Sequence, residues 1–460
     1  EEAVTAYDRS IELDPTSAQA TYDRGLTLLR LSRHQDAVES FDRVLALVPG
    51  FAPAFFHKGI ALAALNQQEE AVRNYDSALA LTPSDAAALY QKGVSLARLE
   101  NFEEAIASFD AAIIQDPRNP DPCYQKGLCL AALGRQDEAE AAFGRALELD
   151  PANTEALYHR GLALAELGRF SEAIEALTKT VEVTPAIANA WLIRGFCQFA
   201  LEQFTESVES YNKALDLDTE NPHTWFYKGR AQLSLGNDDE AVESFNRSLA
   251  IIPEFGEAYY YKGVALFRQK RMPDAAMAFE EATRIMPDFT DAFRENGRTL
   301  VALGRYREAV EAFDKVLAVY PKDPVALYGK ARALDHQGLY AEAIPVYAWV
   351  NHVDPDCERA FLYKGFAQML THQYEDAIDT FTSTLAINSA NAEAWMEKGK
   401  ALVFLEKYEQ AVEAFDGYLS IKPDSYEILF EKGLSLTQLG KTGEALECFT
   451  RSISLGLDTA

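Results

Sequence analysis

Apolar and small residues recur along the chain at the spacing of a helix face. Around Gly161, the residues Leu157, Gly161, Leu164 and Leu167 are separated by four, three and three positions, so they form one stripe on a helix. A short turn follows, then a second helical stripe, and in most cases a proline ends it. The pattern predicts pairs of helices and no strands.

The helix pairs repeat every 34 residues. A glycine marks each pair except one, where Ala331 stands, and positions are numbered from it. A small residue follows at +12 and an aromatic residue at +16, with Leu177 as the exception. The glycines are Gly25, Gly59, Gly93, Gly127, Gly161, Gly195, Gly229, Gly263, Gly297, Gly365, Gly399 and Gly433. No insertion or deletion breaks this phase, which predicts a lone helix in residues 1–17 and thirteen helix pairs in residues 18–459, or 27 helices.

Two kinds of small residue have a steric explanation. At the marking glycine and at +12, only a small side chain lets two helices approach closely. Glycines at +7, such as Gly168, are expected to give the first helix a left-handed end.

These positions at this spacing resemble the tetratricopeptide repeat (TPR), and the resemblance covers residues 1–460. It implies an all-α fold, a right-handed α-α superhelix or solenoid, whose first helices line a concave groove. Residues 1–17 would be the second helix of a truncated repeat, and residues 18–459 one continuous superhelix of thirteen repeats. The residue before the glycine, usually Lys or Arg instead of Leu, departs from the family pattern.

Composition narrows the classes of partner. With 43 Lys and Arg against 71 Asp and Glu, the net charge of −28 argues against nucleic acids and anionic membranes. No apolar run is long enough for a membrane span. Five cysteines without a CxxC motif favour a reducing compartment, so we expect a cytoplasmic protein.

The sequence does not predict an enzyme. It contains no GxxxxGK[ST], GxSxG or HExxH motif, and its seven histidines lack ligand spacing, so we expect no catalytic residue, cofactor or metal. The resemblance implies a scaffold that binds a peptide or partner protein in its groove. Two alternatives are the recognition arm of a larger enzyme or sensor whose catalytic domain is absent, and an assembly factor. The opening EEAVTAYD, without Met, suggests a fragment.

Aromatic residues at −3 of the first helices are candidates for the groove surface. In the N-terminal half these include Tyr90, Tyr124 and Tyr158, which would form a trough for a peptide. The alternative is that these rings pack between helices.

A basic cluster is predicted farther along the same surface. Its members are Arg230, Arg294, Arg298 and Arg332, with Tyr260 and Tyr328 beside them. Arginine can bind a carboxylate through two hydrogen bonds, so this cluster would hold an acidic peptide. The alternative is local neutralisation by acids, namely Glu257, Asp291, Glu295 and Asp335.

Three further expectations concern the repeat framework. The basic residues before the marking glycines should pair with the acidic row at +11, such as Asp36 and Glu70. The repeat at residues 324–357 should be the weakest, because Pro345 falls inside its second helix. Apolar residues of the first and last helices should favour end-to-end self-association.

Overall fold

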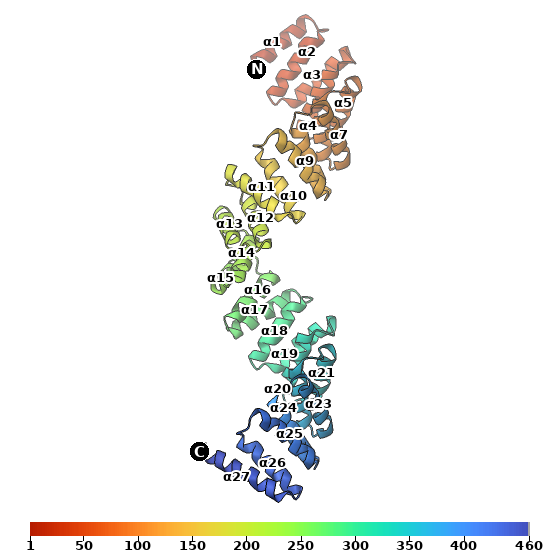
Figure 1. Cartoon of the computed structure of the whole chain (residues 1–460). Coiled ribbons are helices and arrows are strands. Elements are labelled where there is room, and N and C mark those ends of the chain that lie inside the picture. The colour runs from red at the N-terminus through yellow and green to blue at the C-terminus, as the bar shows by residue number, and fades with distance from the viewer. Residues whose placement is uncertain (459–460) are drawn as a thin grey trace. The chain divides into compact units, whose positions relative to one another are not determined.

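The structure of the protein is a computed structural model that describes residues 1–458. Within these residues the chain forms 27 α-helices and no strand, as predicted (Figure 1). The even-numbered helices α2 to α26 are the first helices of the thirteen repeats, and the odd-numbered helices α3 to α27 are the second helices.

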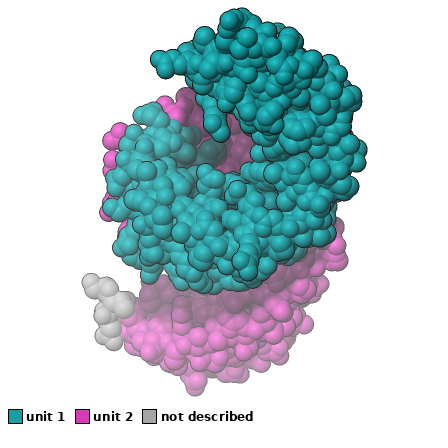
Figure 2. All heavy atoms as spheres, turned by 90° about the horizontal axis from the view of Figure 1, so that it is seen from above, with its two compact units in different colours: residues 1–235 teal, residues 236–460 magenta. Residues whose placement is uncertain are grey.

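The chain divides into two compact units, residues 1–235 and residues 236–460. The helices of unit 1 are α1 Glu2–Leu13, α2 Ala18–Arg30, α3 His34–Leu47, α4 Ala52–Ala64, α5 Gln68–Leu81, α6 Ala86–Arg98, α7 Phe102–Gln115, α8 Asp121–Ala132, α9 Gln136–Leu149, α10 Thr154–Glu166, α11 Phe170–Val183, α12 Ala188–Ala200, α13 Phe204–Leu217 and α14 Pro222–Leu235. Its atoms curve around a hollow (teal in Figure 2).

Unit 2 contains the remaining helices. They are α15 Asp238–Ile251, α16 Gly256–Arg268, α17 Met272–Ile285, α18 Thr290–Ala302, α19 Tyr306–Val319, α20 Pro324–His336, α21 Tyr340–Val353, α22 Glu358–Leu370, α23 Tyr374–Ile387, α24 Ala392–Phe404, α25 Tyr408–Ile421, α26 Tyr426–Gln438 and α27 Thr442–Asp458.

In most repeats the marking glycine contacts the aromatic residue at +16 of the same repeat. A Cβ atom added to Gly127 would lie 2.5 Å from a ring carbon of Phe143, and the same holds for Gly59 and Tyr75. The aromatic rings of these repeats are fully buried. The steric explanation of the glycines is therefore confirmed, and in the repeat of Gly161 the side chain of Leu177 fills the aromatic position.

The turns inside the repeats also follow the prediction. Gly168, at +7, has a φ of 72°, in the left-handed region that glycine adopts without steric cost. Other residues adopt the same conformation at this position, for example Glu100 with a φ of 61°. The turn geometry is thus kept whether or not glycine is present.

The ion pairs correct one prediction. Lys58, Lys92 and Lys126 do not pair with the acidic row at +11 but with aspartates sixteen residues earlier; the Lys126 Nζ lies 2.6 Å from Asp110 Oδ1. In these repeats the lysine before the marking glycine reaches the second helix of the preceding repeat. These pairs tie neighbouring repeats together.

The acidic row at +11 has a different partner. Arg135 and Glu138 are three residues apart, with 2.7 Å between Arg135 Nε and a Glu138 carboxylate oxygen. The same pair recurs in other repeats, as Arg169–Glu172 and Arg305–Glu308. Hydrogen bonding by Arg135 lowers the pKa of the Glu138 carboxyl below its usual value. The acid also lies in the first turn of a helix, where a negative charge is favourable.

Candidate functional site

The predicted site residues all lie on first helices, but in two units. Tyr90 on α6, Tyr124 on α8, Tyr158 on α10 and Arg230 on α14 belong to unit 1. Unit 2 contains Tyr260 on α16, Arg294 and Arg298 on α18, and Tyr328 and Arg332 on α20.

The tyrosines of unit 1 pack within their repeats. The Tyr90 ring centroid is 6.0 Å from that of Phe109, and the Tyr124 ring is 5.9 Å from Phe143. Burial raises the pKa of Tyr124 to about 12. Tyr158 accepts a 2.5 Å hydrogen bond from the Asn189 side chain. These rings are half-buried, so they provide packing as well as part of the surface.

Arg230 and Tyr260 each contact aromatic rings. The guanidinium of Arg230 lies over Phe199, 5.1 Å from the ring centroid. Tyr260 packs on Phe279 at 6.0 Å and on Phe289 at 4.8 Å, and burial raises its pKa to about 12. Both side chains are therefore held in place by their neighbours.

Arg294 is neutralised by two carboxylates. It forms ion pairs with Asp291 and with Asp323, whose carboxylate oxygen lies 2.8 Å from Nη2. These residues border a hollow of about 720 Å³ together with Tyr320 and Lys322. The sequence pointed to Asp291 but not to Asp323, which also accepts a hydrogen bond from the backbone N–H of Ala326 at the start of α20. An aspartate directly before Pro324 is a helix-start signal that could have indicated its position.

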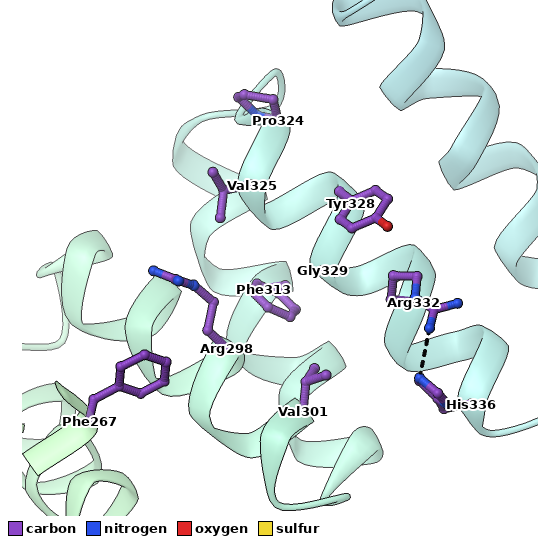
Figure 3. A pocket seen from close by; sticks show the side chains of 10 residues that line it. All are labelled: Phe267, Arg298, Val301, Phe313, Pro324, Val325, Tyr328, Gly329, Arg332 and His336. Atoms are coloured by element: carbon purple, nitrogen blue, oxygen red, sulfur yellow. Dashed lines mark hydrogen bonds between the residues drawn. The ribbon is translucent and has the colours of Figure 1, made fainter. Parts of the chain in front are cut away.

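Arg298 and Arg332 lie at a different hollow, on the surface formed by α16, α18 and α20 (Figure 3). This cavity has a volume of about 530 Å³. We call it the Gly329 cavity. Its lining residues are Phe267, Arg298, Val301, Phe313, Pro324, Val325, Tyr328, Gly329, Arg332 and His336.

The two arginines of the Gly329 cavity differ in exposure and in how many of their donors are already bonded. Arg298 has 47% of its side chain exposed and pairs with Glu295 through Nη1 alone. Arg332 is 20% exposed, pairs with Asp335 at 2.8 Å, and donates a hydrogen bond to His336 Nε2. Glu295 and Asp335 thus contribute to local neutralisation, whereas Glu257 forms no ion pair with any residue in 1–458.

The sequence did not indicate a cavity here. Phe267, Val301, Phe313 and Gly329 were not among the predicted site residues. The available signal was the position of Gly329, −2, where several other repeats carry a ring.

Residues 1–458 contain no group of three or more His, Cys, Asp or Glu side chains placed to hold a metal ion. None of the helices in this part of the chain is long and apolar enough to cross a membrane. Cys123, Cys129 and Cys197 are buried in the repeat core.

The chain belongs to the tetratricopeptide repeat family and has an all-α superhelical repeat fold. The family model matches residues 1–50, 56–120, 124–186, 161–222, 198–254, 248–288, 294–350, 367–426 and 396–456. Membership in this family supports a protein-interaction scaffold. No curated protein matches the chain.

Several solved structures are similar to parts of the chain. YrrB, described as a TPR protein with an unusual peptide-binding site, is 27% identical over 44% of this chain and 99% of its own, with a TM-score of 0.38. MamA from Desulfovibrio magneticus RS-1 is 28% identical over 36% and 95%, with a TM-score of 0.35. Yeast Tom70 is 18% identical over 86% and 96%, with a TM-score of 0.33.

Proposed function

We propose that this chain is a non-catalytic scaffold that binds an acidic peptide segment of a partner protein at the Gly329 cavity. The observation that carries the proposal is the position of Arg298 and Arg332 at the rim of a mostly apolar cavity, in a chain of net charge −28. Apolar hollows with a few polar groups at fixed positions are typical of ligand sites. Arginine favours carboxylate ligands because its planar guanidinium can donate two parallel hydrogen bonds.

Arg298 is the better of the two arginines to mutate. Its side chain is half exposed, and its Nε and Nη2 atoms have no hydrogen-bond partner within residues 1–458. Replacing Arg332 with an acid would instead place a second carboxylate beside Asp335 and disturb the fold.

The proposal is tested by selecting binders to the whole chain from a displayed random-peptide library. We expect the selected peptides to be enriched in Asp and Glu, to bind less tightly at higher salt, and to lose affinity for Arg298→Glu. Arg307→Glu is the matched control, because Arg307 carries the same charge on the exposed side of α19, with 88% of its side chain accessible. Selected peptides without acidic enrichment, or with unchanged affinity for Arg298→Glu, would contradict the proposal.

A further inference from the structure

Residues at −2 of the first helix repeatedly place a ring beside the aromatic residue of the preceding repeat. Tyr363 lies nearly parallel to Tyr347, with centroids 6.4 Å apart and planes 20° apart. Tyr261 is placed in the same way on Phe245, at 6.3 Å and 19°. The ring at −2 therefore covers the +16 ring of the repeat before it.

Gly329 occupies this −2 position without a side chain. Its backbone closes against the ring of Phe313, which is the +16 residue of the preceding repeat, and an added Cβ would overlap that ring. Gly329 and Phe313 both line the Gly329 cavity, and no side chain at −2 extends into it.

The repeat symmetry also shows what would lie over such a ring. In the next repeat the guanidinium of Arg332 is 3.8 Å from the centroid of the Tyr363 ring. Moving this arrangement back by one repeat of 34 residues takes Arg332 to Arg298, Tyr363 to Gly329 and Tyr347 to Phe313. Two of the three groups are present, and the central ring is missing. Arg298 rests instead beside Phe267, at 5.4 Å.

We infer that the Gly329 cavity takes one aromatic side chain of a partner peptide, with an adjacent carboxylate bound by Arg298. The entering ring takes the place that Tyr363 holds in the next repeat, with Arg298 over its face. Arg298 Nε and Nη2 donate no hydrogen bond to any residue in 1–458. These two donors then bind a neighbouring acidic group of the peptide. This inference rests on the proposed function and adds the chemistry of the ligand.

The contacts around the cavity favour a ring over an aliphatic chain. Val301 and Val325 form apolar walls and Phe267 an aromatic one, while Tyr328 stands beside Gly329 on α20 (Figure 3). A guanidinium over a ring adds attraction that it does not give to an alkyl group. The charge of Arg298 favours an acidic neighbour over a basic one.

The test uses three short peptides and the whole chain. The probe is acetyl-Glu-Tyr-Glu-amide; acetyl-Glu-Ala-Glu-amide lacks the ring, and acetyl-Gln-Tyr-Gln-amide lacks the charge. Binding is measured by ligand-observed NMR titration. We expect the probe to bind about tenfold more tightly than either control peptide, which corresponds to a cation–π or charge-assisted contact of ordinary strength.

Two variants assign the binding to the cavity. Gly329→Tyr places a ring at −2, as several other repeats have, and should weaken the probe about tenfold by filling the cavity, with a shift of the Phe313 ring that an added Cβ would overlap. Gly50→Tyr is its control, because an added Cβ at Gly50 meets nothing within 4 Å. Arg298→Gln should weaken the probe by a similar factor while changing no core contact, and Arg307→Gln is its control. Arg298→Gln keeps the test decisive even if Gly329→Tyr does not fold.

The outcomes separate this inference from the proposed function. If the probe binds no better than the alanine peptide, or binds Gly329→Tyr and Arg298→Gln as well as the unchanged chain, the aromatic site is wrong. The scaffold proposal then still stands on the library selection and on its own variant, Arg298→Glu. If the library yields no acidic peptide, the scaffold proposal fails regardless of the tripeptide.

Discussion

The close contact between the marking glycine and the aromatic residue at +16 of the same repeat leads to a prediction about two glycines of one repeat. Gly127 on α8 faces the buried ring of Phe143, and an added Cβ would lie 2.5 Å from a ring carbon. Gly144 on α9 is also helical, but an added Cβ there would meet only Arg160 Nε at 3.9 Å. Changing either glycine to alanine therefore increases helix propensity by the same amount, but only at Gly127 does the new methyl group meet a buried ring.

The magnitudes follow from two opposing effects. Alanine is favoured over glycine inside a helix by about 1 kcal/mol, and this gain applies to both variants. Only Gly127→Ala forces a buried ring to shift, and such overpacking costs about 1–3 kcal/mol. Gly144→Ala should thus be stabilising, and the free energies of opening of the two variants should differ by about 1–3 kcal/mol.

Hydrogen exchange of the α8 and α9 amides measures this difference in the whole chain, because it reports local opening repeat by repeat. We expect slower exchange in Gly144→Ala and faster exchange in Gly127→Ala, with a ratio of about fivefold or more between the two. If both variants slow exchange to the same extent, the ring does not restrict the glycine position. The steric account of the repeat would then be refuted.

Three further predictions concern local stability, pH and self-association. The repeat at residues 324–357 should exchange faster than its neighbours, because Pro345 inside α21 removes a backbone hydrogen bond at a cost of about 3 kcal/mol; equal protection would contradict this. Burial lowers the pKa of His159 below its ordinary 6.5, so the folded chain binds this proton less readily than the unfolded chain. Its contribution to stability should be complete above pH 6.5 and lost as the pH falls through the lowered value, and His159→Phe should flatten this part of the melting-temperature profile. Leu446 and Ile453 on α27 are 67% and 62% exposed, and we expect weak concentration-dependent association in sedimentation that is abolished by changing both to glutamate; a strict monomer at all concentrations would oppose it.

Most of the fold was predictable because its determinants are local. The contact between Gly127 and Phe143 joins residues sixteen positions apart, and the turn at Gly168 depends on a single residue, so both leave a periodic mark in the sequence. The partners of the ion pairs were harder to predict from the sequence. Which acid Lys58 reaches depends on the crossing of α3 and α4 in neighbouring repeats, and the structure selects Asp42 over the acidic row at +11.

The candidate site was predictable only in part. Arg298 and Arg332 were found because their charge contrasts with the acidic composition, and their partners Glu295 and Asp335 were found because they lie three residues away. The Gly329 cavity was missed because one of its lining residues is a glycine, which has no side chain to indicate a site. An absence becomes visible only when the same position is compared across repeats that carry Tyr261 or Tyr363.

The lysine–aspartate pairs between neighbouring repeats have a consequence for how chains of this type change length during evolution. Lys126 pairs with Asp110, and Lys92 pairs with Asp76, across the same interval of sixteen residues. Deleting residues 86–119 would remove Asp110 and Lys92 together and place Lys126 sixteen residues after Asp76. Any two contacts between neighbouring repeats that contain this ion pair can therefore replace each other. Loss or duplication of a 34-residue block therefore leaves no lysine or aspartate of these pairs without its partner. A deletion of a different length would break both the ion pair and the glycine–aromatic contact.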